Sequence, residues 1–321
     1  MNLNFHDTEL SLQQKVDQLL TQQTQEWDLA EKNYKGLDKA QKREFVFDNR
    51  VSVGVQFNAE RIYSSAAKVD AKSISERKCF LCLPNLPEQQ KGVDFGNDYV
   101  VLVNPFPIFP RHLTIPHRQH IDQLIKGRMG DMLDLAKSLT DFVVFYNGPK
   151  CGASAPDHFH FQAGNKGFMP IEKEYHTLSR TIVKGKDKCR ASVFSNYLRQ
   201  CLILDGDDKN LLRNWFEEVY ELMKAILPSD PEPMMNVLVS FEQGRWKIFI
   251  FPRKLHRPWQ FFEEGEKQIL LSPASVDFGG VLITPREEDF TKLTAEDAVD
   301  IFRQVTWEEE AFEKLITDFS H

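Results

Sequence analysis

The sequence predicts an α+β protein in which helices flank antiparallel sheets and the chain forms two weakly similar halves. Three observations support this prediction. Short apolar segments with the features of strands recur along the chain, separated by turns that contain glycine, proline or asparagine. Amphipathic helical segments lie between them. After Gly164 the same organisation returns weakly, so we place one half at residues 1–165 and the other at residues 166–321.

Composition limits the classes of function. The chain has 321 residues, 41% of them hydrophobic, which is enough for a large core. The net charge of −7 argues against a nucleic-acid-binding protein, so a phosphate site must be a local basic cluster. No apolar run reaches the ~18 residues of a membrane helix, and the first residues lack the pattern of a signal peptide. Five cysteines, an odd number, favour a reducing cytoplasm. We expect a cytoplasmic protein with neither membrane nor nucleic-acid partners.

The first half begins with residues 8–44, which read as a helical packing arm because leucine and valine recur at helical spacing. Residues 45–58 look like a strand, a turn and a second strand. Residues 127–141 form an amphipathic pattern that predicts a helix across a sheet, with Met132, Leu135, Ala136 and Leu139 pointing inward.

The second half repeats this organisation weakly. A polar stretch at residues 184–188 predicts a hairpin tip, and residues 205–227 carry a helix with one apolar stripe. Strands then return on either side of Gly244. The basic segment 253–258 is the best phosphate candidate of this half, and residues 277–286 look like a second copy of the strand, proline and charged turn at residues 113–120. Two amphipathic helices end the chain.

The most informative stretch is His158-Phe159-His160-Phe161-Gln162. Side chains alternate between the two faces of a strand, so His158, His160 and Gln162 share one face and the two phenylalanines share the other. The phenylalanines are suited to anchoring the strand in a core. The polar face presents two imidazoles and an amide, which are costly to bury without partners.

The surroundings of this strand point to a family. An apolar strand at residues 142–147 ends in an Asn-Gly turn, and the small-residue loop 151–154 precedes the His-x-His-x-Gln strand. This order resembles the active-site segment of the histidine-triad superfamily, and more closely its transferase branch, in which glutamine replaces the third histidine. That branch includes galactose-1-phosphate uridylyltransferase, diadenosine tetraphosphate phosphorylase and GDP-hexose phosphorylase. The matching residues are Asn147, Gly152, Ser154, His158, His160 and Gln162, with one residue more than the family pattern between Ser154 and His158.

The resemblance implies histidine-triad-like sheets and a covalent mechanism. By resemblance, His160 is the nucleophile that attacks an α-phosphate and forms a nucleotidyl-histidine. Gln162 can hydrogen-bond a phosphate oxygen but has no titratable proton, which favours transfer to a phosphate-bearing acceptor over hydrolysis. We expect a nucleotidyltransferase or phosphorylase that acts on a nucleotide-sugar or a dinucleoside polyphosphate, with phosphate or a sugar phosphate as acceptor. A hydrolase of the same fold and a non-catalytic nucleotide-binding regulator are the alternatives.

Further substrate contacts are expected elsewhere in the first half of the chain. Arg61 and Lys68 flank small hydroxyl residues, a composition suited to phosphate or ribose, and the equivalent region of related phosphorylases contacts the nucleotide. By resemblance, Asn104 in the rigid Asn-Pro-Phe-Pro loop faces the base. The oligomeric state stays open. Related uridylyltransferases are dimers, and the N-terminal arm could serve a homodimer here.

A Cys-x-x-Cys motif at Cys79 and Cys82 is a separate signal. A thioredoxin-type redox site needs a helix that starts at the first cysteine, and Pro84 and Pro87 follow too soon for a stable one. A metal site fits better, although two cysteines supply only half of a tetrahedral set.

Resemblance supplies the other half of the metal site. The uridylyltransferases and several histidine-triad proteins complete the ligand set with two histidines, which correspond here to His120 and His158. His117 is a rival for His120, because the spacing between proline and histidine varies in the family. We therefore predict a structural zinc ion bound by Cys79, Cys82, His120 and His158.

Overall fold

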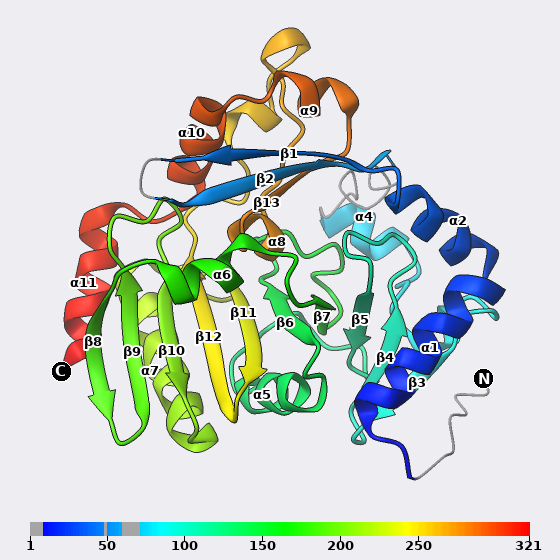
Figure 1. The fold of residues 1–321 in the computed structure, drawn as a ribbon, viewed down its shortest axis with the longest axis horizontal. Coiled ribbons are helices and arrows are strands. Elements are labelled where there is room, and N and C mark those ends of the chain that lie inside the picture. Colours follow the sequence, from blue (N-terminus) through cyan, green and yellow to red (C-terminus); the bar gives the residue numbers. More distant parts are fainter. Residues whose placement is uncertain (1–8, 48–49, 60–70) are drawn as a thin grey trace.

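The largest feature of the computed structural model, which describes residues 9–47, 50–59 and 71–321, is one ten-stranded sheet (Figure 1). All its pairings are antiparallel, in the order β3-β4-β5-β7-β6-β11-β12-β10-β9-β8. The strands are β3 (Gly92–Phe95), β4 (Tyr99–Val103), β5 (His112–Pro116), β6 (Phe142–Asn147), β7 (His160–Asn165), β8 (Arg180–Lys186), β9 (Cys189–Phe194), β10 (Leu202–Gly206), β11 (Met235–Glu242) and β12 (Arg245–Pro252).

Each half of this sheet has the same topology. The strand order β3-β4-β5-β7-β6 in the first half corresponds to β8-β9-β10-β12-β11 in the second. The helices α5 (Met129–Ser138) and α7 (Lys209–Ile226) occupy equivalent positions between the third and fourth strands. The halves join where β6 pairs with β11, with Asn147 opposite Asn236. The predicted fold class, with its two weakly similar halves, is confirmed.

A second sheet corrects one detail of the predicted repeat. The strand β13 (Val281–Thr284) pairs in parallel with β2 (Ser52–Phe57), and β1 (Gln41–Val46) pairs with the other edge of β2. Residues 277–286 are therefore not a second copy of residues 113–120, because the strand equivalent to β5 is β10. A short apolar run fixes the presence of a strand but not its sheet, since partner choice depends on distant residues.

The N-terminal arm is helical over most of the predicted range, but it is not one helix, and residues 41–44 belong to the strand β1. It contains α1 (Leu12–Glu26) and α2 (Asp28–Leu37), separated at Trp27, whose backbone is extended. Ser11 caps α1 through a capping box with Gln14. The apolar residues Val16 and Leu19 of α1 belong to the core beneath the sheet, and α1 contacts β3 and β4. The arm therefore packs on its own chain.

Helices and the small sheet cover opposite faces of the large sheet. One hydrophobic core lies under α1, α5, α7 and α11 (Glu309–Ser320), and Phe159 and Phe161 are buried in it. The other core lies between the large sheet and a layer formed by the small sheet with further helices. These helices are α6 (Pro170–Thr177), α8 (Ser275–Phe278), α9 (Glu287–Lys292) and α10 (Ala295–Val305). Because side chains alternate along β7, its polar residues face this second layer.

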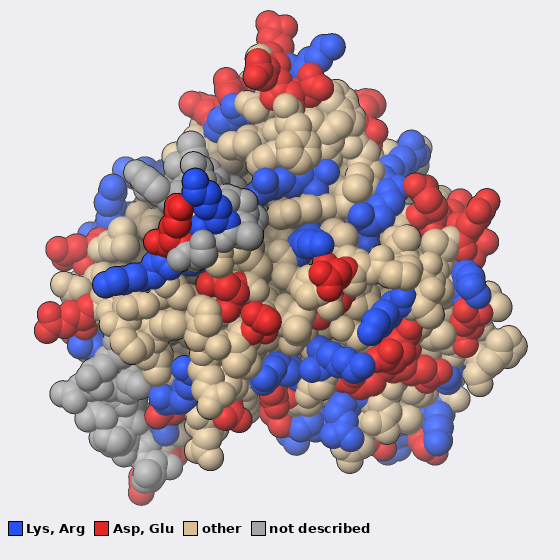
Figure 2. Space-filling view, turned by 180° about the vertical axis from the view of Figure 1, so that it is seen from behind, with Lys and Arg blue, Asp and Glu red and all other residues tan. Residues whose placement is uncertain are grey.

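Several short helices connect the larger elements. The remaining short helices are α4 (Ala71–Glu76), η2 (Leu83–Asn85), η3 (Trp259–Phe261) and η4 (Gly265–Lys267). Of the helices that the structure describes, none combines the length and the apolar character needed to cross a bilayer. On the face opposite to that of Figure 1, acidic and basic side chains lie interspersed (Figure 2).

Candidate active site and metal centre

A cavity of about 430 Å³ opens between the large sheet and the layer that carries β13 and α8. Both halves of the chain line it. The lining includes these residues predicted from the sequence as catalytic or substrate-binding: Asn104, Asn147, Gly152, Ser154, His160 and Gln162. The other two predicted contacts, Arg61 and Lys68, lie outside the residues that the structure describes.

His160 begins β7 and is 3% exposed. Its Nδ1 lies 2.8 Å from the carbonyl oxygen of His158. A carbonyl oxygen can only accept, so Nδ1 carries the proton and Nε2 carries the lone pair. Burial lowers the pKa of His160 to about 4, which keeps the ring neutral near neutral pH. The site therefore presents an uncharged imidazole with its nucleophilic nitrogen opposite the backbone contact.

The orientation of Gln162 is set by His112 on the neighbouring strand β5. The Nδ1 of His112 accepts the N–H of Ile108 at 3.1 Å, so its Nε2 carries a proton and donates to Oε1 of Gln162 at 3.1 Å. The amide oxygen of Gln162 is thus engaged, and its NH₂ group remains for a ligand. His112 is a site residue that was not predicted from the sequence. The pairing of β5 with β7 would have indicated one, because His112 sits diagonally across from Gln162.

Asn147, at the end of β6, is oriented by residues of the second half. Its Oδ1 accepts hydrogen bonds from Nδ2 of Asn236 at 2.9 Å and from the backbone N–H of Ser275 at 2.8 Å. Its NH₂ group is thereby left to a ligand, as in Gln162. Arg253 donates in turn to Oδ1 of Asn236 and is 1% exposed. This arginine, from the basic segment 253–258, supports the site rather than facing the cavity.

The loop before the active strand requires small residues. Gly152 has a φ of +95°, and a Cβ there would lie 2.5 Å from the Cβ of Ala274.

Asn104, at the other side of the cavity, donates to Oγ1 of Thr114 at 2.9 Å and accepts the N–H of Phe106 at 2.9 Å. Both ends of its amide are engaged within the protein, which makes the Asn-Pro-Phe-Pro loop rigid.

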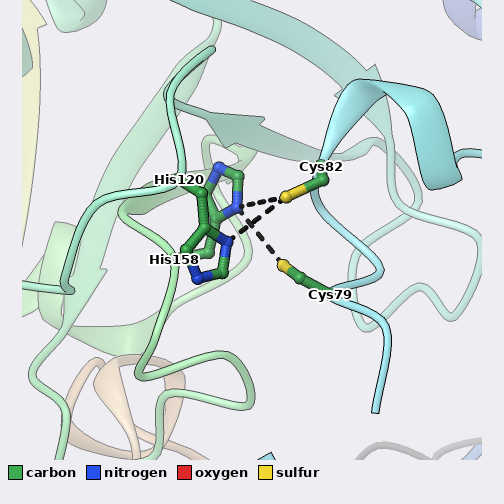
Figure 3. Close-up of side chains that lie close together, drawn as sticks. All are labelled: Cys79, Cys82, His120 and His158. Carbon is green, nitrogen blue, oxygen red and sulfur yellow. Dashed lines mark hydrogen bonds between the residues drawn. The ribbon is translucent and has the colours of Figure 1, made fainter. Parts of the chain in front are cut away.

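Figure 3 shows a second cluster of side chains. It is close to the cavity, because Phe80 and Leu81, between its two cysteines, line the cavity. Its four ligand atoms, one each from Cys79, Cys82, His120 and His158, all lie within 4.8 Å of one another. The Sγ of Cys79 is 3.3 Å from Nδ1 of His158, and the Sγ of Cys82 is 3.3 Å from Nδ1 of His120. Zinc bonds of roughly 2.0–2.3 Å in a tetrahedron give ligand separations of this size. The donor set fits a structural zinc ion.

Hydrogen bonds prepare His158 for this cluster. Its Nε2 lies 2.8 Å from the carbonyl oxygen of His117, so Nε2 carries the proton and Nδ1 directs its lone pair at the sulfurs. The cluster contains the ring of His120 and not that of His117, whose Nδ1 lies 3.1 Å from the backbone nitrogen and 3.2 Å from the carbonyl oxygen of Gln119. The geometry therefore favours His120 over His117. His158 also links the two sites, since its carbonyl oxygen accepts Nδ1 of His160.

Gln123 holds the backbone of His160 where β6 and β7 diverge. Its Nε2 lies 3.0 Å from the carbonyl oxygens of both Asn147 and His160, and its Oε1 accepts the N–H of His160 at 2.7 Å. Behind it, the hydroxyl of Tyr146 lies 2.9 Å from the carbonyl oxygen of Gln123 and 2.6 Å from Oε1 of Glu232. These residues were not predicted from the sequence, because nothing in local periodicity marks them.

Glu232 predicts a pH dependence of stability. Burial raises the pKa of Glu232 from 4.5 to about 7. Between these values the folded protein binds a proton that the unfolded chain releases, so stability falls as the pH rises through this window, by up to about 3 kcal/mol. A glutamine can mimic the protonated acid by donating to Tyr146 and accepting the N–H of Ile125. We expect Glu232→Gln to lose less stability than wild type between pH 5 and 7.5 in urea unfolding. Equal losses in both proteins would contradict this assignment.

Comparison with known proteins supports the fold. Residues 19–165 match the family model of a domain of unknown function, DUF4922, and residues 171–321 match the model described as GDPGP1-like, C-terminal domain. No curated protein sequence matches the chain significantly.

Crystal structures of the yeast Ap4A phosphorylase Apa2 resemble this chain over most of both lengths. One of these structures has a TM-score of 0.56 at 17% identity, and the match covers 87% of this chain and 97% of the yeast chain. The complex with Ap4A gives 0.57 at 17% identity, covering 90% and 97%, and the complex with AMP gives 0.57 at 18%, covering 90% and 96%. At these identities the likeness shows the fold. Together with the GDPGP1-like match, this fold agrees with the predicted resemblance to the transferase branch of the histidine-triad superfamily.

Proposed function

We propose that this chain is a nucleotidyltransferase or phosphorylase that forms a covalent nucleotidyl intermediate on His160. The observation that supports this most strongly is the fixed tautomer of His160 in a cavity that also receives the NH₂ groups of Gln162 and Asn147. The substrate is a nucleotide-sugar or a dinucleoside polyphosphate, and the acceptor is phosphate or a sugar phosphate. The yeast structures with Ap4A and AMP support a nucleotide in this fold.

In the first half-reaction, Nε2 of His160 attacks the α-phosphorus. A P–N bond forms, the P–O bond to the leaving group breaks, and the electron pair departs with the leaving oxygen. The imidazole becomes cationic, and the carbonyl oxygen of His158 stabilises the N–H at Nδ1. The amide NH₂ groups of Gln162 and Asn147 are positioned to donate to oxygens of the transferring phosphoryl group.

In the second half-reaction, an oxygen of the acceptor phosphate attacks the same phosphorus. The P–N bond breaks and its electron pair returns to Nε2, which restores the neutral ring. The acceptor arrives as an anion and needs no general base. Water would need a general base, and the amide of Gln162 neither accepts nor releases a proton near neutral pH. The intermediate therefore persists until an acceptor binds.

The zinc ion proposed for Cys79, Cys82, His120 and His158 has a structural role. It would join the Cys-x-x-Cys loop to His158, two residues before β7, and supply no step of the reaction. Asn104, Gly152, Ser154, Arg61 and Lys68 remain proposed substrate contacts. A homodimer remains a prediction.

Incubation with labelled GDP-sugar, UDP-sugar and diadenosine tetraphosphate, each with and without phosphate, tests the proposed function. We expect nucleotide label on the protein under denaturing conditions, and a nucleoside diphosphate product that requires phosphate. A requirement for a sugar phosphate would instead select the uridylyltransferase-like reaction. Equal turnover with water alone would identify a hydrolase, and binding without turnover would identify a regulator. Either of these last two results would overturn the proposal.

Gln162 predicts the balance between transfer and hydrolysis. Replacing it with histidine supplies a titratable group beside the intermediate, so we expect hydrolysis of the nucleotidyl-protein to accelerate roughly 10-fold to 100-fold relative to phosphorolysis. The measurement is the ratio of nucleoside monophosphate to diphosphate released from the isolated intermediate. Gln162→Ala, which adds no such group, serves as the control. An unchanged ratio in Gln162→His would show that residue 162 does not govern access of water.

A further inference from the structure

The described lining of the cavity carries little positive charge for the substrates proposed above. Among its described lining residues, Arg257 is the one permanent cation. The neighbouring His256 also lines the cavity, and burial lowers its pKa to about 4, so it is neutral. The carboxylate of Asp277 is already engaged by the N–H groups of Ala274 and Ile283. A ligand with two adjacent phosphates therefore has one guanidinium to bind among these residues.

The guanidinium of Arg257 is held in place before any ligand arrives. Its Nε donates to Oγ of Ser272 at 3.2 Å, and its central carbon lies 4.0 Å from the ring centroid of Phe261. Stacking on an aromatic face and one hydrogen bond fix the plane of the group. Its two Nη atoms make no hydrogen bond or ion pair with any residue that the structure describes. Arg257 thus differs from Arg253, whose Nη atoms are bound to Asn236 and to backbone carbonyls.

We propose that Arg257 forms a second phosphate subsite, which binds the phosphate next to the one attacked by His160. This inference rests on the proposed function. The ligand class is the terminal phosphate of a nucleoside diphosphate. In a reaction that passes through a nucleotidyl-histidine, the departing phosphate and the acceptor phosphate react with the same phosphorus and occupy the same place in turn. The planar fork of an arginine binds two oxygens of such a phosphate. The second half of the chain, which lacks the His-x-His-x-Gln motif, would thus supply the acceptor site.

Paired binding measurements test the subsite. We compare ADP with AMP, and GDP with GMP, by calorimetry in a His160→Ala background, in which no transfer occurs. For the base that binds, we expect the diphosphate to bind at least about tenfold tighter than the monophosphate. Arg257→Gln should bring this ratio close to one and leave monophosphate affinity within about twofold, whereas Arg257→Lys should keep part of the ratio because it keeps the charge.

Lys254→Gln is the matched control. It removes a positive charge from the same segment, its ammonium pairs with Glu308, and it does not line the cavity, so both affinities should stay unchanged. A ratio that persists in Arg257→Gln would overturn the subsite and leave nucleotidyl transfer intact. An equal loss of monophosphate and diphosphate affinity would also overturn it, since the arginine would then act on the fold. Failure of every protein to bind any of these nucleotides would overturn the proposed function as well.

Discussion

Replacing His160 with alanine should abolish the nucleotidyl-protein and lower turnover by at least ~10³-fold. The side chain removed is a buried ring whose Nδ1 is tied to a carbonyl oxygen, which leaves the lone pair on Nε2, the proposed nucleophile. The measurement is retention of nucleotide label on denatured protein, together with the rate of phosphate-dependent product formation. The expected loss is large because alanine has no group that can form the covalent bond and release it again.

Two comparison variants make this result specific. Gln162→Ala should retain the label, because the nucleophile is intact, while its rate falls. His176→Ala removes an imidazole that is exposed and does not line the cavity, so labelling should match wild type. Label that persisted in His160→Ala would place the nucleophile elsewhere and would remove the basis of the mechanism.

Replacing Cys79 with serine should remove the zinc and destabilise the chain. We expect about one zinc per chain in wild type and below about 0.3 in the variant, because a structural site needs all its ligands. Since metal binding contributes to folding free energy, the variant should unfold at a clearly lower temperature, and a chelator should shift wild type in the same direction. Elemental analysis and thermal unfolding measure the two effects.

Cys189→Ser is the control for the metal prediction. Cys189 is buried, as Cys79 is, but it lies outside the four-residue cluster. The control should therefore keep its metal even if it loses some stability through packing. Zinc at the wild-type level in Cys79→Ser, or no zinc in wild type, would end the proposal.

Local periodicity was sufficient for the faces of the active strand but not for its start, because β7 begins at His160 and the predicted strand member His158 lies outside it. A period of two residues places Phe159 and Phe161 in a core and turns His160 and Gln162 to the opposite face, whatever the rest of the chain does. The amphipathic segment at residues 127–141 likewise specified the helix α5, where Met132 and Leu135 are buried. In both places a few neighbouring residues contain the whole signal, so the prediction needed no knowledge of distant contacts.

Local sequence could not rank neighbours that have the same chemistry. His117 and His120 are three positions apart and both suit zinc, and only the course of the chain after β5 brings His120 to the sulfurs. Arg253 and Arg257 share one basic segment. The first is buried and holds Asn236, whereas the second lines the cavity. Burial of a side chain is decided by what packs over it, and those residues are remote in sequence.

The sequence by itself determined which residue types share one face of the active strand and that two similar halves follow one another. It also located the Cys-x-x-Cys motif as half of a possible metal site. Only the tertiary structure decided which nitrogen and which amide group face the ligand. Those choices depend on hydrogen bonds between residues as far apart as Asn147 and Asn236, 89 positions from each other. The reason is physical: periodicity acts over a few residues, whereas tautomers and amide orientations follow the donors and acceptors that the folded chain brings into contact.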